Sequence, residues 1–476
     1  MTGTNPLAIL SMMAPELLVV ESIVLFLFLI FTMLSSWSMR DDPAILLPRT
    51  RFTEYFLLGA LSLLWFAFAR LMGFDQVLFA LELALAILVS TIHPGISIGF
   101  FVFLLFLRPW EIAPPDDVVL AALPRSFAYL SMVTAFLYLS RAKKLSPKIG
   151  TPAVILLLFA GWTFLSTFIA SDSAAAQSKF FEVFFKSVIL FLVVTHAIRD
   201  QLSYRLMKAA FVFAALGLSS VSIYRSVFST EAAGRLGTFG LLADPNDVSA
   251  IMILSFPFAW YFLRRGDRSL YLKIICATTI VATFVLLYFA KSRGALFSLL
   301  VMFAAMGVVT IKDKRKGAII AVLAAMVFIP ATTLFHRSAD DTGSSTDSRI
   351  IYWKAGLSMA THSPLLGVGF GGYPQNFERY TSEFIEYGER TAHSTWVLAM
   401  AETGFPGLIL IACFFLWALR ASWLMREEYP ELFFATLGYG VAASFLSHTW
   451  SIYLYLLVAV VFAGTRIATE PKGELT

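Results

Sequence analysis

Apolar runs long enough to cross a lipid bilayer follow one another along almost the whole chain. A helix needs roughly 20 mainly apolar residues to span the hydrocarbon core, and about 15 runs approach that length. They lie near 17–37, 53–72, 75–92, 94–108, 118–140, 152–170, 180–198, 206–224, 247–264, 271–290, 294–311, 317–335, 394–419, 431–447 and 449–467. Only 14% of the residues are charged, compared with about 25% in an average soluble domain. The sequence therefore predicts an all-α polytopic membrane protein with roughly 14–15 transmembrane helices.

Lys and Arg residues accumulate in alternate loops, and this pattern predicts the orientation of the helices. Cytoplasmic loops of membrane proteins carry an excess of positive charge. If the N-terminus lies outside, the inward loops include "SRAKKLSPK" and "KDKRKG" and, with the C-terminal tail, contain most of the 36 Lys and Arg residues. We therefore expect the N-terminus outside and the C-terminus in the cytoplasm. The first run has no small-residue cleavage site after it, so we expect a retained helix rather than a signal peptide.

One long hydrophilic loop, residues 336–392, separates the twelfth predicted helix from the thirteenth and falls on the outer side. The stretch from Arg349 to Met359 has helical periodicity, with apolar residues interleaved with polar ones. "GVGFGGYP" then predicts a turn, because it is rich in Gly and ends with Pro.

Four basic residues from distant parts of the sequence fall on this outer side. They are Arg235 in "GRLGTFGLLADPND", Arg293 in the short turn "KSRGAL", Arg349 in the long loop and His393 at the end of that loop. The planar guanidinium of Arg suits phosphate oxygens, and His accepts protons near neutral pH. This combination favours a site for a lipid-linked pyrophosphate with His393 as a base.

Each of these residues also has a simpler interpretation. Arg235 could be a snorkelling residue at the interface, and Arg293 could anchor to lipid phosphate. Arg349 could pair with Asp347, and His393 could cap a helix or lie at the interface. An outward Arg293 in a short turn runs against the charge bias, which favours a functional role for it.

Glu402 lies nine residues after His393, inside the apolar run that begins at Trp396. This separation corresponds to about 2.5 helical turns. An acidic group within a membrane is costly, so the sequence predicts a polar partner for it or an inner cavity.

The sequence offers no motif for a nucleotide or a metal cofactor. It contains neither G-x-x-x-x-G-K-[ST] nor H-E-x-x-H, and "GFGGYPQ" fits a turn better than a nucleotide fingerprint. The acidic pairs Asp41–Asp42, Asp116–Asp117 and Asp340–Asp341 form no convincing set of metal ligands. We therefore expect no cofactor, no metal and no nucleic-acid partner.

The motif around His393 resembles the O-antigen ligase and polymerase superfamily of bacterial envelope enzymes. That family carries His, then Asn, Ser or Gln, then nine residues, then Gly-x-x-Gly. This chain has His393 and Ser394, followed at that spacing by Gly404 and Gly407. Three further elements are similar to the family: "GTFGLLADPN", the "SRG" turn at Arg293, and Arg349 followed by "PLLGVGFG". The similarity covers residues 150–467, whereas 1–149 resemble the family less.

The resemblance implies a GT-C-like fold and an inverting, metal-independent glycosyltransferase in the bacterial inner membrane, with the N-terminus and residues 336–392 in the periplasm. Its donor would be a glycan on undecaprenyl pyrophosphate, and its acceptor lipid A-core or another hydroxyl, among membrane lipids. His393 would be catalytic, and Arg293, Arg349 and Arg235 would bind the pyrophosphate. Ser394, Glu402, Gly404 and Gly407 would be supporting residues, and the two glycines would let a neighbouring helix approach closely.

Several functions fit these residues. The leading candidate is ligation of O-antigen to lipid A-core. An O-antigen polymerase or a protein O-oligosaccharyltransferase would use the same donor. A transporter or flippase of lipid-linked glycans belongs to a different class and would place polar residues near the membrane midplane. The chain, 1–476, is expected to form a single transmembrane helical domain.

Overall fold

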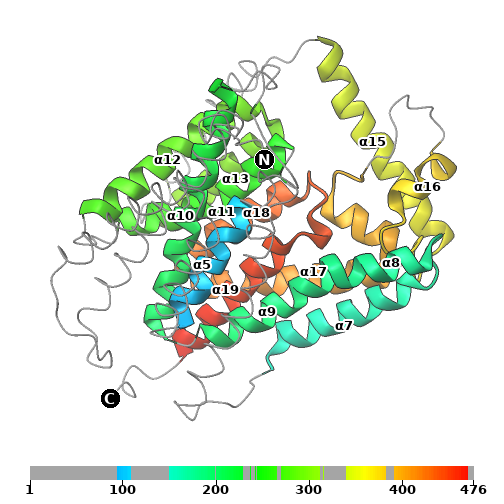
Figure 1. The fold of residues 1–476 in the computed structure, drawn as a ribbon, viewed down its shortest axis with the longest axis horizontal. Helices are drawn as coiled ribbons and strands as arrows, with labels where there is room; N and C mark the ends of the chain where they lie inside the picture. The colour runs from blue at the N-terminus through cyan, green and yellow to red at the C-terminus, as the bar shows by residue number, and fades with distance from the viewer. Residues whose placement is uncertain are drawn as a thin grey trace, which may run out of the picture. The chain divides into compact units, whose positions relative to one another are not determined.

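The architecture comes from a computed structural model that describes residues 94–108, 149–198, 200–228, 236, 242, 244–264, 270–310, 315, 339–381 and 391–469. Every regular element within these ranges is a helix. Seven of the helices are long and apolar enough to cross a membrane. The predicted all-α polytopic membrane fold is therefore confirmed (Figure 1).

Most predicted spans within the described residues coincide with helices. The helices are α5 (Pro94–Leu107), α7 (Thr151–Thr167), α8 (Ser173–Lys179), the π-helical turn η2 (Phe180–Phe184), α9 (Phe185–Ala197), α10 (Gln201–Phe228), α11 (Pro245–Arg264), α12 (Leu270–Ala290), α13 (Arg293–Thr310), α15 (Ala339–His362), α16 (Tyr373–Tyr380), α17 (Thr395–Leu424), α18 (Pro430–Ala443), the 3-10 turn η4 (His448–Trp450) and α19 (Ile452–Thr469). The predicted spans near 17–37, 53–72, 75–92, 118–140 and 317–335 lie outside the described residues.

The described helices group into two compact units. The first contains α5, α10 and α12, and α11 contributes residues to both. Within the first unit, α5 and α10 pack along each other, with the rings of Phe106 and Phe211 5.5 Å apart. Lys208 is buried there, with its Nζ 4.0 Å from the centre of the Tyr261 ring.

The second unit contains α7 to α9, α13 and α15 to α19. α17 packs against α7, α15, α18 and α19, and α13 packs against α18. Arg466 near the end of α19 donates a hydrogen bond to the carbonyl of Thr195 near the end of α9. At the opposite end of α19, His448 and Thr449 bond to Thr395 at the start of α17. The unit therefore has two ends, and the first turn of α17 lies at the end opposite to the last turns of α9 and α19.

The described part of the predicted outer loop, residues 339–381 and 391–392, is largely helical. α15 includes the predicted helix from Arg349 to Met359 and is longer, because its polar first half has no apolar periodicity for a sequence pattern to detect. The predicted turn is confirmed, and we call residues 363–372 the glycine-rich turn. Gly367, Gly369 and Gly371 adopt φ of 67°, 90° and 74° there, a region that glycine enters without steric cost.

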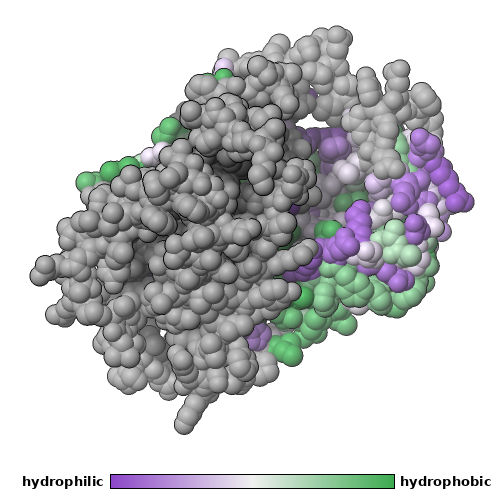
Figure 2. Space-filling view, viewed as in Figure 1, coloured by the Kyte–Doolittle hydropathy of each residue, from purple (hydrophilic) through white to green (hydrophobic). Residues whose placement is uncertain are grey.

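Polar residues gather on α8 and α16, which form the polar end of the second unit, and apolar residues cover α7 (Figure 2). Exposed polar residues on α8 and α16 include Lys179, Gln375 and Glu378. On α7, Leu157, Leu158 and Leu165 are exposed by 45%, 58% and 51%. Exposed leucines are typical of a lipid-facing helix, whereas the polar end is typical of a water-facing surface.

Candidate functional site

α17 is interrupted at Gly404. The residue has φ 70° and ψ −174°, which is far from helical geometry and is essentially restricted to glycine. Pro406 follows and has no N–H to donate to the preceding turn. Residues 405–424 alone span about 30 Å, enough to cross the hydrocarbon core. The sequence predicted one uninterrupted membrane helix here, whereas the structure has a short first segment, residues 395–403, and a second segment, residues 405–424.

The glycine-rich turn and α7 supply the hydrogen bonds that this interruption leaves open. Val368 N donates to the carbonyl of Ala401 at 2.8 Å, and Phe405 N donates to the carbonyl of Pro364 at 2.9 Å. Trp162 Nε1 of α7 donates to the carbonyl of Thr403 at 2.9 Å. The backbone groups at the break are thereby paired, which is what burial away from water requires.

The atoms nearest to the two glycines of the motif, Gly404 and Gly407, belong to the glycine-rich turn and to α17 itself. A Cβ at Gly404 would lie 2.4 Å from the carbonyl oxygen of Leu365, which belongs to the glycine-rich turn. A Cβ at Gly407 would lie 1.8 Å from Oγ1 of Thr403, in the same helix. The glycine-rich turn therefore contacts Gly404 closely, and α7 packs along the same helix.

Glu402, the last but one residue of the first segment, is buried. Its Oε1 accepts a hydrogen bond from Tyr373 N at 3.1 Å, and its Oε2 accepts one from Trp450 Nε1 at 2.8 Å. The backbone N–H of Gly371 also donates to this carboxylate, and Lys179 lies close enough to interact with its charge. The polar partners that the sequence predicted for an acidic group are therefore present.

Three aromatic rings pack against Trp450. The ring of Trp450 lies 4.7 Å from that of Phe370, 5.1 Å from that of Phe184, and 5.8 Å from that of Phe159, on which it stacks. Phe184 ends the π-helical turn η2, a kind of irregularity that is frequent at functional sites. These rings pack around the indole that donates to Glu402.

His393 comes directly before α17 and has a left-handed backbone, with φ 44°. Its N–H donates to Oγ of Ser447 at 2.9 Å, and its ring lies 5.6 Å from the ring of Tyr352 of α15. The side chain is partly exposed. Ser394 is the N-cap of α17, and its Oγ accepts from Val397 N at 3.5 Å. Ser394 therefore contributes to where the helix begins, and His393 lies at the polar end of the unit with part of its ring accessible.

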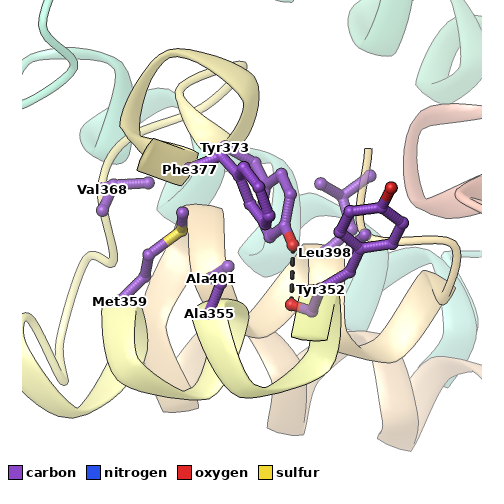
Figure 3. Packing of buried hydrophobic residues seen from close by; sticks show 9 residues of the cluster. Tyr352, Ala355, Met359, Val368, Tyr373, Phe377, Leu398 and Ala401 are labelled. Atoms are coloured by element: carbon purple, nitrogen blue, oxygen red, sulfur yellow. Dashed lines mark hydrogen bonds between the residues drawn. The ribbon is translucent and has the colours of Figure 1, made fainter. Parts of the chain in front are cut away.

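Tyr352 and Tyr373 belong to a buried cluster between α15, α16 and α17 (Figure 3). The Tyr373 hydroxyl donates to the carbonyl of Tyr352 at 2.7 Å, as the dashed line shows. Burial, followed by the neighbouring Tyr352 and Glu402, raises the pKa of the Tyr373 hydroxyl well above its usual value. The hydroxyl therefore keeps its proton and remains a donor, which ties α16 to the middle of α15.

Arg349 is partly buried on α15, three residues before Tyr352. Residues three apart on a helix share a face, so Arg349 lies on the side of α15 from which Tyr352 meets His393. Arg293 is exposed at the first position of α13.

The turn between α18 and α19 relates Arg293 to His393. A Cβ at Gly294, next to Arg293, would lie 3.4 Å from Cβ of Phe445. Phe445 is two residues before Ser447, which binds the His393 backbone. The structure thus brings Arg293, Arg349 and His393 to the same end of the second unit, while Arg235 lies outside the described residues.

Known proteins match this part of the chain. Residues 278–412 match the O-antigen ligase (Wzy_C) family. We call residues 278–412, which make up less than a third of the chain, the ligase region on account of this similarity. The resemblance inferred from the sequence motifs is thereby confirmed. The ligase region includes Arg293, Arg349, His393 and Glu402 and leaves out Arg235.

A curated relative is the exopolysaccharide production protein ExoQ of Rhizobium meliloti (strain 1021), which is 28% identical over 218 residues. The match covers 41% of this chain and 50% of that protein. The chain therefore spans about half the length of the curated relative that it matches.

Several contacts of the site come from outside the ligase region, and sequence reasoning missed them. Lys179 and Trp162 come before the region, and Ser447, His448 and Trp450 come after it. His448 is buried, with its Nδ1 2.8 Å from the hydroxyl of Tyr439. One signal was available in the sequence: "SHTW" places polar residues between two apolar runs, on the side predicted to be the outer one.

Proposed function

We propose that this protein transfers a glycan from an undecaprenyl-pyrophosphate-linked donor to an acceptor hydroxyl at the periplasmic face of the bacterial inner membrane, with O-antigen ligation to lipid A-core as the leading reaction. The observation that supports this most is the setting of His393. A partly exposed imidazole is held at the polar end of the unit by Ser447 and Tyr352. An Arg on the same helix face as Tyr352, Arg349, supplies a fixed positive charge nearby.

The proposed reaction is a single displacement. An imidazole nitrogen of His393 accepts the proton of the acceptor hydroxyl, and the hydroxyl oxygen attacks the anomeric carbon. A bond forms between that oxygen and the anomeric carbon while the bond from the carbon to the pyrophosphate oxygen breaks. Attack from the face opposite the leaving group inverts the configuration. Arg293, Arg349 and Arg235 stabilise the negative charge that the leaving lipid pyrophosphate acquires.

A second candidate within the same chemistry is polymerisation, in which the acceptor is another glycan. The name of the relative, an exopolysaccharide production protein, favours this alternative. A hydroxyl on a protein is a third acceptor for the same proposed donor. All three reactions use the same base and the same cationic residues, so the identity of the acceptor separates them.

Reconstituted protein with a lipid-linked glycan donor tests the proposal. Lipid A-core, a second lipid-linked glycan and a Ser-rich peptide are offered in separate vesicles, with and without EDTA, and products are separated by mass. Glycan on lipid A-core supports ligation, and a longer lipid-linked glycan supports polymerisation. We expect EDTA to leave the rate unchanged, because the proposed chemistry needs a base and fixed cations only. Movement of an intact donor across the bilayer with no new glycosidic bond would contradict the proposal and favour a flippase.

A further inference from the structure

The Glu402 side chain binds three N–H donors that come from two distant places in the chain. They are the backbone groups of Gly371 and Tyr373 and the indole of Trp450. Both side-chain oxygens of Glu402 act as acceptors in these hydrogen bonds. Lys179 supplies a compensating charge from α8. Glu402 is 2% exposed, so the acceptor and donor molecules of the proposed reaction do not reach it.

One line of contacts leads from Glu402 Oε1 to the His393 ring. Tyr373, which donates to Oε1, is the first residue of α16. The carboxylate therefore lies at the helix end that favours negative charge. The hydroxyl of the same tyrosine donates to the Tyr352 carbonyl, and the Tyr352 ring contacts the His393 ring. Gly371 bonds to the same carboxylate, so the glycine-rich turn is fixed along with α16.

A second line of contacts leads from Oε2 to the His393 backbone. Trp450, which donates to Oε2, ends the η4 turn. Ser447 precedes that turn and accepts the hydrogen bond from His393 N. Thr395 joins the same turn to α17, because its hydroxyl donates to the Leu446 carbonyl and accepts from His448 N. The backbone on both sides of His393 is therefore tied to the element that Trp450 anchors.

We infer that Glu402 is a positioning residue, which holds the ring of His393 through Tyr373 and Tyr352 and its backbone through Trp450 and Ser447. A non-glycine residue with positive φ is strained and persists only where its surroundings over-determine it. His393 is such a residue, with φ 44°. The two lines of contacts meet at one buried carboxylate, so its loss loosens both at once. The effect of this positioning on glycan transfer rests on the proposed function, in which the imidazole acts as a base. The positioning itself does not depend on that function.

Glu402→Gln tests the inference with minimal change of shape. The amide keeps one acceptor and turns the other into a donor that faces an N–H, so one hydrogen bond breaks and the side chain must shift, which weakens the other line as well. Trp450→Phe removes the indole donor of the second line and keeps an aromatic ring. Tyr373→Phe removes the hydroxyl of the first line alone. Thr436→Val is the matched control, because Thr436 is buried in the same unit and bonds only within α18.

The first measurement is hydrogen exchange by mass spectrometry in the purified protein, which needs no activity. In Glu402→Gln we expect faster exchange in residues 363–381 and in residues 391–398, with α13 unchanged. Trp450→Phe should accelerate exchange mainly in residues 391–398, and Tyr373→Phe mainly in residues 363–381. Thr436→Val should change neither segment. Unchanged exchange at residues 391–398 in Glu402→Gln overturns the inference, whatever the protein transfers.

The second measurement is the transfer rate at saturating donor. A misplacement of about 1 Å costs up to about 10²-fold, so we expect kcat of Glu402→Gln to fall about 10- to 100-fold. Thr436→Val should keep the transfer rate of the wild type, even if its melting temperature falls as much as that of Glu402→Gln. If Glu402→Gln and Thr436→Val lost the same fraction of the transfer rate, Glu402 would only stabilise the fold and would not position His393. If the wild type transfers no glycan, the proposed function fails, and the exchange data still decide the role of Glu402.

Discussion

The two segments of α17 meet at Gly404 and differ in what surrounds them. In the first, residues 395–403, most side chains are buried, and Thr395 and Glu402 bond to the turn between α18 and α19. In the second, residues 405–424, Ile409, Leu416 and Leu424 are exposed by 59%, 57% and 64%. Lipid dictates the composition of the second segment, whereas hydrogen bonds to distant parts of the chain dictate the first.

This difference explains why a single apolar run contains an acidic residue. A window of hydropathy averages both segments and reports one long span. The first segment is apolar because it is packed inside protein, and it can hold Glu402 because N–H donors surround that side chain. The membrane span proper needs only the second segment. One helical segment, residues 395–403, therefore separates His393 from the start of the membrane span, and His393 lies next to Tyr352 and Ser447.

Cysteine labelling at the two ends of α17 gives an all-or-none test of the proposed orientation. In a background with Cys276 and Cys413 replaced by Ser, Gln375→Cys lies on α16 at the polar end of the second unit and Glu428→Cys follows the second segment. Both positions are exposed. We expect a membrane-impermeant maleimide added to the periplasmic side to label Gln375→Cys alone. Labelling of Glu428→Cys alone would reverse the topology and move the site to the cytoplasm.

Gly404→Ala should abolish the junction between the segments. The new Cβ would meet the Leu365 carbonyl at 2.4 Å, on a backbone with φ 70°. Strain and overpacking together cost about 2–6 kcal/mol, which is enough to lower the melting temperature and the yield of monodisperse protein. Gly161→Ala is the control, because nothing lies within 4 Å of its Cβ. If Gly404→Ala and Gly161→Ala have the same melting temperature, the break in α17 does not need glycine.

Removing the arginines should weaken donor binding and leave the fold intact. A hydrogen bond to a charged group contributes about 1.5–3 kcal/mol, so Arg349→Ala should bind undecaprenyl pyrophosphate about 10- to 100-fold less tightly. Arg293→Lys keeps the charge and loses the planar fork, so we expect a smaller loss. Equilibrium binding of a fluorescent donor measures both. Wild-type affinity in both variants would remove these residues from the pyrophosphate site.

The sequence predicted the spans better than it predicted the site, for a physical reason. The bilayer imposes a length and a composition on each helix, and both are visible in a local window. The break at Gly404 is invisible in such a window, because apolar residues continue through it. Tyr352 and Trp450 lie 41 residues before and 57 residues after His393, and only folding brings them to it. Their residue types fit a hydrophobic core equally well, so pattern alone could not select them.

The transfer rate of His393→Ala, compared with its donor affinity, tests the central proposal most directly. The acceptor hydroxyl is a weak nucleophile, and loss of a general base typically costs about 10²–10⁴-fold in rate. We expect purified His393→Ala to bind undecaprenyl pyrophosphate like the wild type, to melt within a few degrees of it, and to transfer glycan more slowly by about that factor. A near-normal transfer rate in His393→Ala would contradict the proposal and leave His393 as an interface residue.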